Sequence, residues 1–304
     1  MESRKGCWLR SVLRSAPTEG KSKQIPRSGR NDSWVLIFVT FADAKQRFSS
    51  RVADYARYRP GYPAELIPLL RRECGLQAEH VIADVGSGTG LLTKVFLENG
   101  NRVIGVEPNR EMRAAGDEFL ARYEKFSSVN GSSDATTLGD GSVDFLTAAQ
   151  AFHWFEPVGT RREFARILKP GGWAIMMWND RRIGETAFGR EYEDLLVRYS
   201  TDYTKVKVAY PEAHDMEEFF GQEKVQRFEL PNFQEFDFAG LAGRLRSSSY
   251  APREDDALFA PMMAALRELF DANQKSGKVR MDYTTQIYAG RLEKESNSSG
   301  AEPV

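Results

Sequence analysis

The stretch VIADVGSGTG, from Val81 to Gly90, decides the fold of this chain. Apolar and β-branched residues end in an acid, and three glycines follow at alternate positions. A buried parallel strand that passes into a nucleotide-binding turn has this pattern. The pattern leaves open whether the turn would hold a dinucleotide, a triphosphate or a nucleoside without phosphate.

The glycine spacing separates these three possibilities. A dinucleotide turn reads G-x-G-x-x-G, but the position of its third glycine holds Leu91 here. A P-loop requires a lysine directly after its last glycine, and none follows Gly90. The spacing G-x-G-x-G instead predicts a turn without side chains, on which a nucleoside with a small uncharged or cationic tail can lie. Glu107 ends the next predicted strand, 21 residues beyond Gly86, close to the offset at which an acid binds ribose hydroxyls.

Strands and helices alternate from residue 80 to residue 180, which predicts an α/β fold with a parallel sheet covered on both faces. Predicted strands occupy residues 80–86, 101–107, 126–131, 142–152 and 173–180. Predicted helices occupy residues 90–100, 109–123 and 157–172, and a helix, a turn and a second helix precede the first strand. The expected architecture is therefore a Rossmann-like sheet of mostly parallel strands.

The pattern changes after Asp180. We expect helices at residues 184–200, 215–221, 239–249 and 253–273, a strand with a turn at 224–238, and a long edge strand at 277–292. The domain is predicted to span residues 41–292, with a small helical lid within about 184–220 and 240–270. Acceptor choice should lie with residues 184–220 and 240–249. Residues 1–40 are expected to form a basic, disordered extension, and residues 293–304 a disordered tail.

Composition limits the possible partners. The chain has 304 residues, a formal net charge of -1 and only three histidines and two cysteines, none at metal-ligand spacing. We therefore expect no metal, no nucleic-acid partner and no membrane partner, because no apolar run approaches the roughly 18 residues of a membrane span. A cytoplasmic monomer or homodimer is expected. The basic, serine-rich residues 1–30 also fit a mitochondrial or plastid transit peptide.

Five ordered motifs carry a family resemblance. They are VIADVGSGTG, GVEPNREM, GSSDATTLGDGSVD, AQAFHWF and RILKPGGWAIMMW, at residues 81–90, 105–112, 131–144, 149–155 and 166–178. Together they resemble the class I S-adenosylmethionine-dependent methyltransferases, and more narrowly the small-molecule branch related to the ubiquinone/menaquinone and trans-aconitate methyltransferases. The resemblance runs from about Phe48 to Leu292, and it implies a seven-stranded sheet.

The resemblance implies S-adenosyl-L-methionine as the cofactor and assigns residues to each of its parts. Asp84 and the glycine loop are assigned to the methionine end, and Glu107 to the ribose diol. The assigned residues are Tyr55, Arg59, Asp84, Gly86, Ser87, Gly88, Gly90, Glu107, Pro108, Asn109, Met112, Asp134, Ala135 and Gln150. Among them, Pro108, Asn109 and Met112 match positions that line adenine, and Asp134 and Ala135 match the pair that reads its edge.

A substrate pocket is expected beyond the ends of the fourth and fifth strands. Its candidate residues are His153, Trp154, Phe155, Trp178 and Arg181. His153 is the candidate catalytic base if the acceptor is a hydroxyl or an acidic carbon, although a packed wall is the alternative. Trp178 could face the pocket or fill the core. A carboxylate acceptor would need no base, and Arg59 or Arg181 would anchor it.

The predicted function is methyl transfer to a small molecule through oxygen, carbon or carboxylate. One alternative is a protein that binds the cofactor without catalysis. A protein or nucleic-acid methyltransferase is a further alternative, disfavoured because the chain has no basic stripe and no N/D-P-P-Y/F tetrapeptide after the fourth strand.

Overall fold

The computed structural model describes residues 57–200, 203, 213–221 and 224–293. The predicted extension at residues 1–40, nearly all of the predicted tail and Tyr55 lie outside the described residues.

One seven-stranded sheet forms the centre of the fold, in the order β3-β2-β1-β4-β5-β7-β6. Its strands are β1 (Val81–Val85), β2 (Arg102–Val106), β3 (Phe126–Val129), β4 (Val143–Ala149), β5 (Leu168–Arg181), β6 (Val225–Phe236) and β7 (Val279–Gly290). The pairs among β1 to β5 are parallel, whereas β7 runs antiparallel to both β5 and β6. The predicted Rossmann-like, mostly parallel fold is confirmed.

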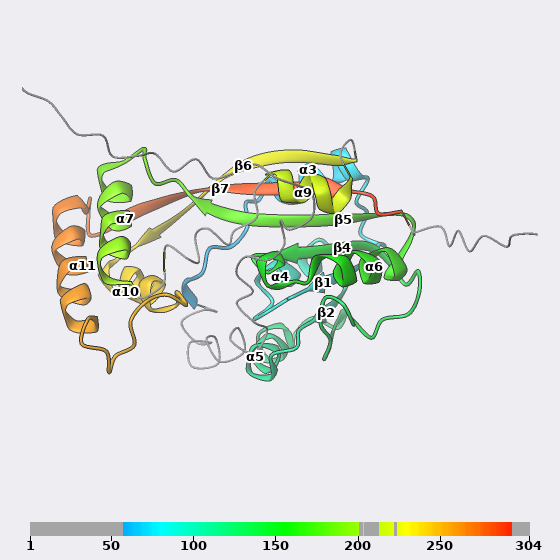
Figure 1. The fold of residues 1–304 in the computed structure, drawn as a ribbon, viewed down its shortest axis with the longest axis horizontal. Coiled ribbons are helices and arrows are strands. Elements are labelled where there is room, and N and C mark those ends of the chain that lie inside the picture. The colour runs from blue at the N-terminus through cyan, green and yellow to red at the C-terminus, as the bar shows by residue number, and fades with distance from the viewer. Residues whose placement is uncertain (1–56, 201–202, 204–212, 222–223, 294–304) are drawn as a thin grey trace, which may run out of the picture. The chain divides into compact units, whose positions relative to one another are not determined.

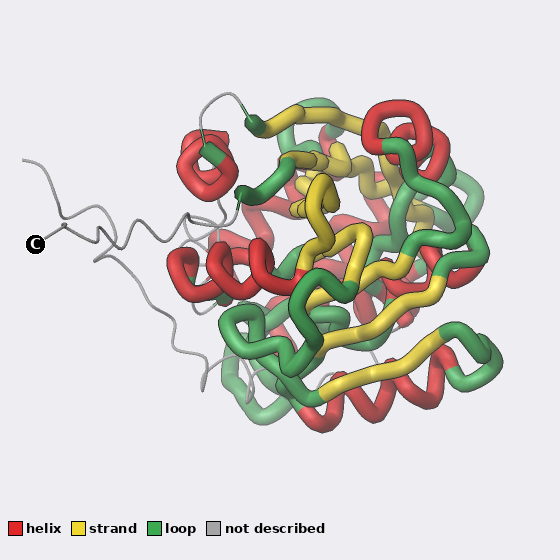
Figure 2. Tube along the Cα trace, turned by 90° about the vertical axis from the view of Figure 1, so that its right-hand side faces the viewer, coloured by secondary structure: helices red, strands yellow, loops and turns green. Residues whose placement is uncertain are grey.

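Helices cover both faces of the sheet (Figure 2). They are α3 (Leu66–Cys74), α4 (Leu91–Glu98), α5 (Arg110–Leu120), α6 (Pro157–Ile167), α7 (Ala187–Tyr199), α9 (Ala213–Phe220), α10 (Phe238–Arg246) and α11 (Phe259–Asn273), with a 3₁₀ turn η1 at Phe152–Trp154. The side chains of β5 alternate between two cores, because successive residues of a strand point to opposite faces. Met176 joins the core on the α6 face, and Met177 joins the core on the α3 and α4 face.

Two predictions about the last strands were wrong. No turn interrupts β6, which pairs with β7 without a break from Val225 to Phe236. Pro231 is accommodated because β6 is an edge strand, so one side of it carries no ladder hydrogen bonds. Residues 277–292, which were predicted to form an edge strand, contain β7, and β7 lies between β5 and β6 and not at the edge of the sheet. Its alternating pattern reflects the two different environments above and below the sheet and not an exposed edge.

The long strands β5, β6 and β7 extend past the parallel part of the sheet, and α7, α10 and α11 gather at that end (Figure 1). A separate core forms there around residues such as Tyr192, Leu241 and Leu266, joined by Met281 and Tyr283 of β7. We call this part, α7, α10 and α11 with the strand ends that they cover, the lid.

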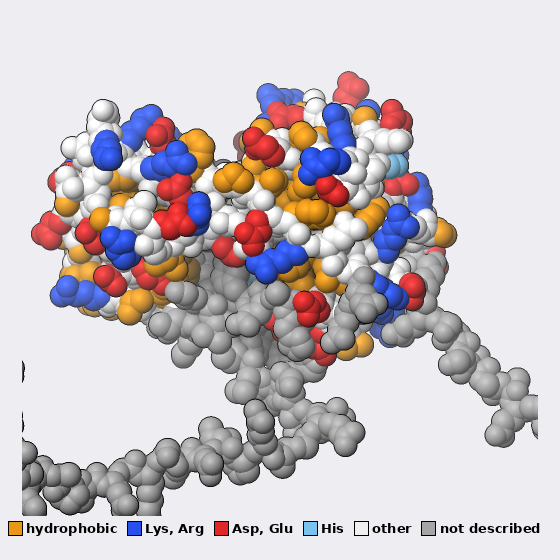
Figure 3. All heavy atoms as spheres, turned by 90° about the horizontal axis from the view of Figure 1, so that it is seen from above, with side chains coloured by type: hydrophobic (Ala, Val, Ile, Leu, Met, Phe, Trp, Pro, Cys, Tyr) orange, Lys and Arg blue, Asp and Glu red, His pale blue; other side chains and the backbone are white. Residues whose placement is uncertain are grey.

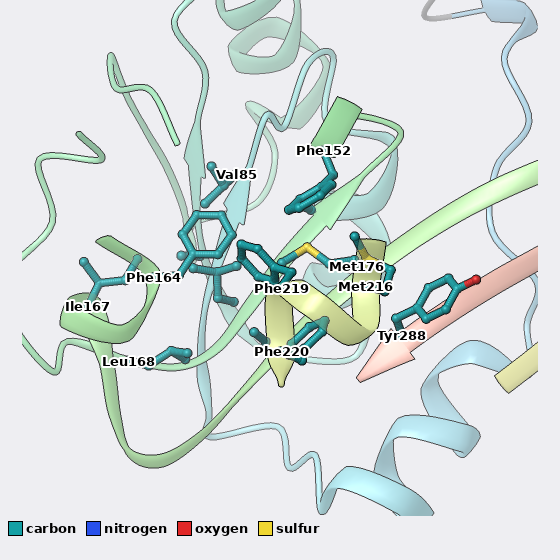
Figure 4. Close-up of a cluster of buried hydrophobic side chains, with 14 of the residues drawn as sticks. Val85, Phe152, Phe164, Ile167, Leu168, Met176, Met216, Phe219, Phe220 and Tyr288 are labelled. Atoms are coloured by element: carbon teal, nitrogen blue, oxygen red, sulfur yellow. The ribbon is translucent and has the colours of Figure 1, made fainter. Parts of the chain in front are cut away.

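Helix α9 falls within residues 184–220, where the lid was expected, but it packs on the sheet core. Met216, Phe219 and Phe220 point into the cluster that contains Phe152 and Phe164 (Figure 4). The ring centroids of Phe152 and Phe219 are 4.8 Å apart in an edge-to-face arrangement. The lid therefore consists of α7, α10 and α11 without α9.

Candidate active site

The glycine loop follows β1 and leads directly into α4. Gly86, Gly88 and Gly90 have φ angles of 71°, 56° and 84°. Residues other than glycine rarely adopt these positive φ angles. The loop is also tightly packed, because a Cβ added at Gly86 would lie 2.6 Å from the Cβ of Ala151. The loop therefore requires glycine for both its backbone conformation and its close packing.

Asp84 lies at the end of β1, directly before the loop, and is 1% exposed. Its carboxylate accepts hydrogen bonds from Thr93 Oγ1 at 2.6 Å and Thr147 Oγ1 at 3.0 Å. Burial raises the pKa of Asp84 to about 6, although these hydrogen bonds act to lower it. The two threonines thus fix the orientation of an acid that also lines the cavity described below.

Glu107 lies at the carboxyl end of β2, beside the glycine loop. One carboxylate oxygen accepts from the N–H of Gly88 at 2.9 Å, and the other accepts from the N–H of Asn109 at 2.8 Å. Burial raises the pKa of Glu107, whereas these backbone hydrogen bonds act to lower it. Each oxygen keeps a second acceptor position, so the carboxylate can still bind two hydroxyls of a ligand.

Gln150 follows β4 with a φ of 56°, which is uncommon for a residue other than glycine. Its N–H donates to the carbonyl oxygen of Met177 in β5 at 3.0 Å. This bond holds the strained residue at the end of β4, beside the middle of β5, and Gln150 lines the cavity there. Strained backbone of this kind occurs preferentially at functional sites.

A cavity of about 260 Å³ lies between the glycine loop and the lid. We call its two sides the loop wall and the arginine wall. The loop wall consists of Asp84, Gly86, Ser87, Gly88, Thr89, Leu91, Leu92, Ala149 and Gln150. The arginine wall consists of Arg59, Pro60, Tyr62, Asn179, Asp180, Arg181, Ile183, Tyr203, Arg244, Tyr250 and Tyr283.

The segment from Tyr58 to Gly61 is tied to the lid and to the strands that reach it. The guanidinium of Arg59 donates to the carbonyl of Ser247 at 3.0 Å, and Gln234 donates to the carbonyl of Tyr58 at 3.2 Å. The carbonyl of Gly61 accepts from Asn179 at 3.1 Å and from Asn232 at 2.9 Å. Arg59 thereby contributes to the cavity from a position far from the loop in sequence.

Seven of the residues proposed from the sequence line this cavity: Arg59, Asp84, Gly86, Ser87, Gly88, Gln150 and Arg181. Glu107, Pro108, Asn109 and Met112 lie at the end of β2, beyond the loop, and Asn109 caps α5 by accepting from the N–H of Met112 at 3.0 Å. Asp134 and Ala135 are exposed in the loop after β3, where the Ser132 hydroxyl donates to Asp134 at 2.6 Å. Gly90 ends the loop before α4.

The aromatic candidates after β4 do not line the cavity. Trp178 is 3% exposed in the sheet core, where its ring meets Phe152 edge to face at 6.2 Å between centroids. Trp154 lies against His153, and Phe155 packs at the margin of the same core. Of the two alternatives for Trp178, the structure favours the core.

His153 is also absent from the cavity lining. Burial lowers the pKa of His153 to about 3, and the positive charge of Arg59 acts in the same direction. The imidazole is therefore neutral at pH 7 but weakly basic, which makes it a poor proton acceptor. A role for His153 as a base stays a prediction.

The cavity residues that were not identified from the sequence include Tyr203, Arg244, Tyr250 and Tyr283. Arg244 lies within residues 240–249, a segment already expected to select the acceptor, but its side chain could not be distinguished there from the neighbouring Arg246. Tyr283 belongs to the alternating pattern of β7, which predicts that its side chain is buried but does not predict which residues it contacts.

Comparison with known proteins identifies the domain. Residues 83–176 match the family described as methyltransferase domain. An uncharacterized methyltransferase of Mycobacterium tuberculosis H37Rv is 36% identical over 172 residues, which is 56% of this chain and 66% of that protein. An uncharacterized methyltransferase of Schizosaccharomyces pombe is 32% identical over 135 residues, 44% of this chain and 53% of that protein.

Solved structures share the fold. A protein assigned as a type II methyltransferase from Anaeromyxobacter dehalogenans has a TM-score of 0.56 at 22% identity, covering 78% of this chain and 99% of its own. Phosphoethanolamine N-methyltransferase 2 of Haemonchus contortus, solved with phosphomonomethylethanolamine and S-adenosylhomocysteine, has a TM-score of 0.51 at 13% identity, covering 83% and 59%. Residues 83–176 thus match the methyltransferase domain family, and the sheet has the fold of these solved methyltransferases.

The surface seen over β6 mixes basic and acidic side chains without a stripe of one sign (Figure 3). In the part of the chain that the structure describes, none of the helices has the length and apolar character of a membrane span. Within the same residues, no group of three or more histidine, cysteine, aspartate or glutamate side chains is placed to hold a metal ion.

Proposed function

We propose that this protein transfers a methyl group from S-adenosylmethionine to a small-molecule acceptor held under the lid. The observation that carries the proposal is the cavity itself, which has the glycine loop on one side and lid residues on the other. A ligand on the loop and a second ligand against the lid would therefore meet in the same cavity.

The residues around the loop fit the cofactor. The loop offers glycine backbone at three alternate positions, and Glu107 keeps two acceptor positions for a ribose diol while repelling phosphate. Asp84 would hold the positively charged amino group of the methionine end, and Arg59 its carboxylate. Both side chains line the cavity next to the loop or across from it. The structural relative from Haemonchus contortus, which is solved with the demethylated product, supports this assignment.

When bound, the cofactor supplies a methyl group already activated by a sulfonium, so alignment of the reactants and exclusion of water are the main tasks left to the protein. The glycine loop and Gln150 fix one reactant, since their backbone positions are set by the strand ends. The lid and the segment Tyr58–Gly61 close the other side, because hydrogen bonds to Gln234, Ser247 and Asn232 hold that segment down.

The cavity of about 260 Å³ beside the lid favours a small acceptor over a protein or a nucleic acid. A macromolecular substrate would have to present a single group past the lid, and the face over β6 offers no basic stripe for a nucleic-acid backbone. The second alternative, a protein that binds the cofactor without catalysis, has the same loop wall and is separated by experiment alone.

Titration calorimetry tests the proposal. We expect S-adenosylmethionine and S-adenosylhomocysteine to bind in the micromolar range, whereas NAD and ATP do not bind. Product formation is then screened with radiolabelled methyl donor across small acceptors. Absence of binding by either sulfur nucleoside would contradict the proposed function, and binding without turnover across the screen would favour the non-catalytic alternative.

A further inference from the structure

The arginine wall contains more positive charge than the cofactor requires. Arg59, Arg181 and Arg244 come from three separate segments and line the same cavity, whose lining also includes two acids, Asp84 and Asp180. Burying a charge is costly unless an opposite charge or hydrogen bonds compensate it. An arginine whose positive charge is not balanced within the protein therefore indicates that the cavity binds a negatively charged ligand.

Arg181 has a counter-charge. Its guanidinium is ion-paired with Glu193 of α7, and their side chains are 11% and 12% exposed. The hydroxyl of Tyr203 donates to the same glutamate oxygen at 2.6 Å. The Nε of Arg181 is nevertheless buried without a hydrogen-bond partner, so one edge of this guanidinium is not used within the protein.

Arg244 lacks a counter-charge among the described residues. It is 6% exposed, and none of the carboxylates in the described ranges lies within ion-pair distance of it. Its hydrogen bonds there go to Ser248 Oγ at 3.0 Å and Tyr283 Oη at a long 3.4 Å. A guanidinium has five N–H donors, so most of its donating capacity is left for a ligand.

The pKa of Tyr250, which also lines the cavity, shows the effect of the three positive charges. Burial acts to raise the pKa of Tyr250, but the charges of Arg244, Arg181 and Arg59, with a hydrogen bond to Ser248, hold the pKa below its ordinary value. Three guanidinium groups therefore act on one point of the arginine wall, which is consistent with their shared position in the cavity.

We propose that Arg244 forms an anion subsite that binds a carboxylate of the methyl acceptor. The acceptor would therefore be a small organic acid. The planar guanidinium fork matches a carboxylate in geometry and charge. A single negative charge balances Arg244, because Glu193 already balances Arg181. A phosphate dianion would exceed this need.

This subsite presupposes the proposed function but differs from the cofactor site. S-adenosylmethionine carries one carboxylate and a net positive charge, and Arg59 is sufficient for that carboxylate. Adding the cofactor therefore increases the positive charge in the cavity and leaves Arg244 still uncompensated. A negatively charged second ligand compensates both.

The test measures ligand binding by calorimetry on the full chain saturated with S-adenosylhomocysteine. The probes are benzoate, 3-phenylpropionate and succinate, each compared with its uncharged carboxamide, and phenyl phosphate. The variants are Arg244→Gln and Arg244→Lys, with Arg198→Gln on the exposed face of α7 as the matched control. We expect at least one carboxylate to bind, its amide to bind roughly tenfold or more weakly, and Arg244→Gln to lose a similar factor.

The outcomes are distinguishable. If the wild-type protein binds neither sulfur nucleoside, the proposed function fails before the subsite is tested. If S-adenosylhomocysteine binds but carboxylates and amides bind alike, or phenyl phosphate binds more tightly than any carboxylate, the subsite as proposed is wrong. Loss of S-adenosylhomocysteine binding in Arg244→Gln would also overturn it, because Arg244 would then hold the cofactor. The wild-type comparison decides the matter even if the variants fail to fold.

Discussion

The two walls of the cavity are built in different ways. The loop wall comes mainly from one short stretch of sequence and the adjacent strand ends. Its acid, Asp84, is hydrogen-bonded by Thr93 and Thr147, and Glu107, which lies beyond the loop, is hydrogen-bonded by two backbone N–H groups. The arginine wall is assembled from distant residues, from Arg59 to Tyr283, and Arg244 has no counter-charge in the described ranges.

This difference separates two tasks. The strand ends fix the loop wall, so its surface stays the same when the residues of the lid differ. Such a wall suits a ligand that is always the same. A wall assembled by the lid can change its charge and shape without moving the sheet, which suits the choice of acceptor. The following substitutions should affect one wall and spare the other, beginning with the largest expected effect.

Breaking the ion pair of the arginine wall should cost the most. Glu193→Gln leaves Arg181 buried without its counter-charge, and we expect the free energy of unfolding to fall by about 3 kcal/mol. Denaturant unfolding measures this loss. The double variant Arg181→Met with Glu193→Met should recover most of it, because an apolar pair leaves no buried charge. An equal loss in the double variant would show that packing, and not charge, accounts for the effect.

Gly86→Ala should destabilise the loop wall by about 3 kcal/mol, combining a positive φ with overpacking. The φ is 71° and the new Cβ would lie 2.6 Å from the Cβ of Ala151. The matched control is Gly171→Ala, which has a φ of 78° but no heavy atom within 4 Å of the new Cβ. We expect about 1 kcal/mol for the control, measured by the same unfolding titration. Equal losses would mean that the loop is not packed as described.

Asp84 should make the stability depend on pH. Its pKa is raised from an ordinary value of 3.8 to about 6 in the folded protein, so the folded state binds more protons between these values than the unfolded state does. The free energy of unfolding should therefore fall as pH rises from 4 to 6, by on the order of 3 kcal/mol from this residue.

Asp84→Asn should remove this decrease in the free energy of unfolding between pH 4 and pH 6. Asp117→Asn, on the exposed side of α5, should leave the decrease unchanged. Affinity for S-adenosylhomocysteine should change in the opposite direction and increase as Asp84 loses its proton. Unfolding curves and calorimetry at several pH values test both signs. A stability profile unchanged in Asp84→Asn would contradict the assigned cause.

The smallest of these effects concerns the ribose contact. Glu107→Ala should weaken S-adenosylhomocysteine binding by about 2 kcal/mol, roughly thirtyfold, because it removes the charged acceptor of two hydroxyls. Binding of a carboxylate probe at saturating S-adenosylhomocysteine should remain within about twofold. Glu118→Ala, at an exposed position of α5, serves as the control. Equal weakening of both ligands would show that the two walls are not independent.

The sequence by itself determined the loop wall and the parallel part of the sheet. Three local patterns were sufficient: the glycine spacing, the acid at Glu107 and the alternation of strands and helices. The carboxyl ends of β1 and β2 bring the glycine loop and Glu107 together in any sheet of this order. Glu107 could be proposed from its offset alone. Its two backbone hydrogen bonds place it beside the loop, and its contact with a ribose stays a prediction.

Only the tertiary structure decided the arginine wall and the last two strands. Trp178 and Arg181 are three residues apart in β5, yet the first is buried in the sheet core and the second lines the cavity. Whether Pro231 ends a strand depends on which side of β6 is paired, and the neighbours of Arg244 depend on how α10 packs. Local preference acts over a few residues, whereas shared cavities and counter-charges are set by long-range packing, so only the folded chain shows them.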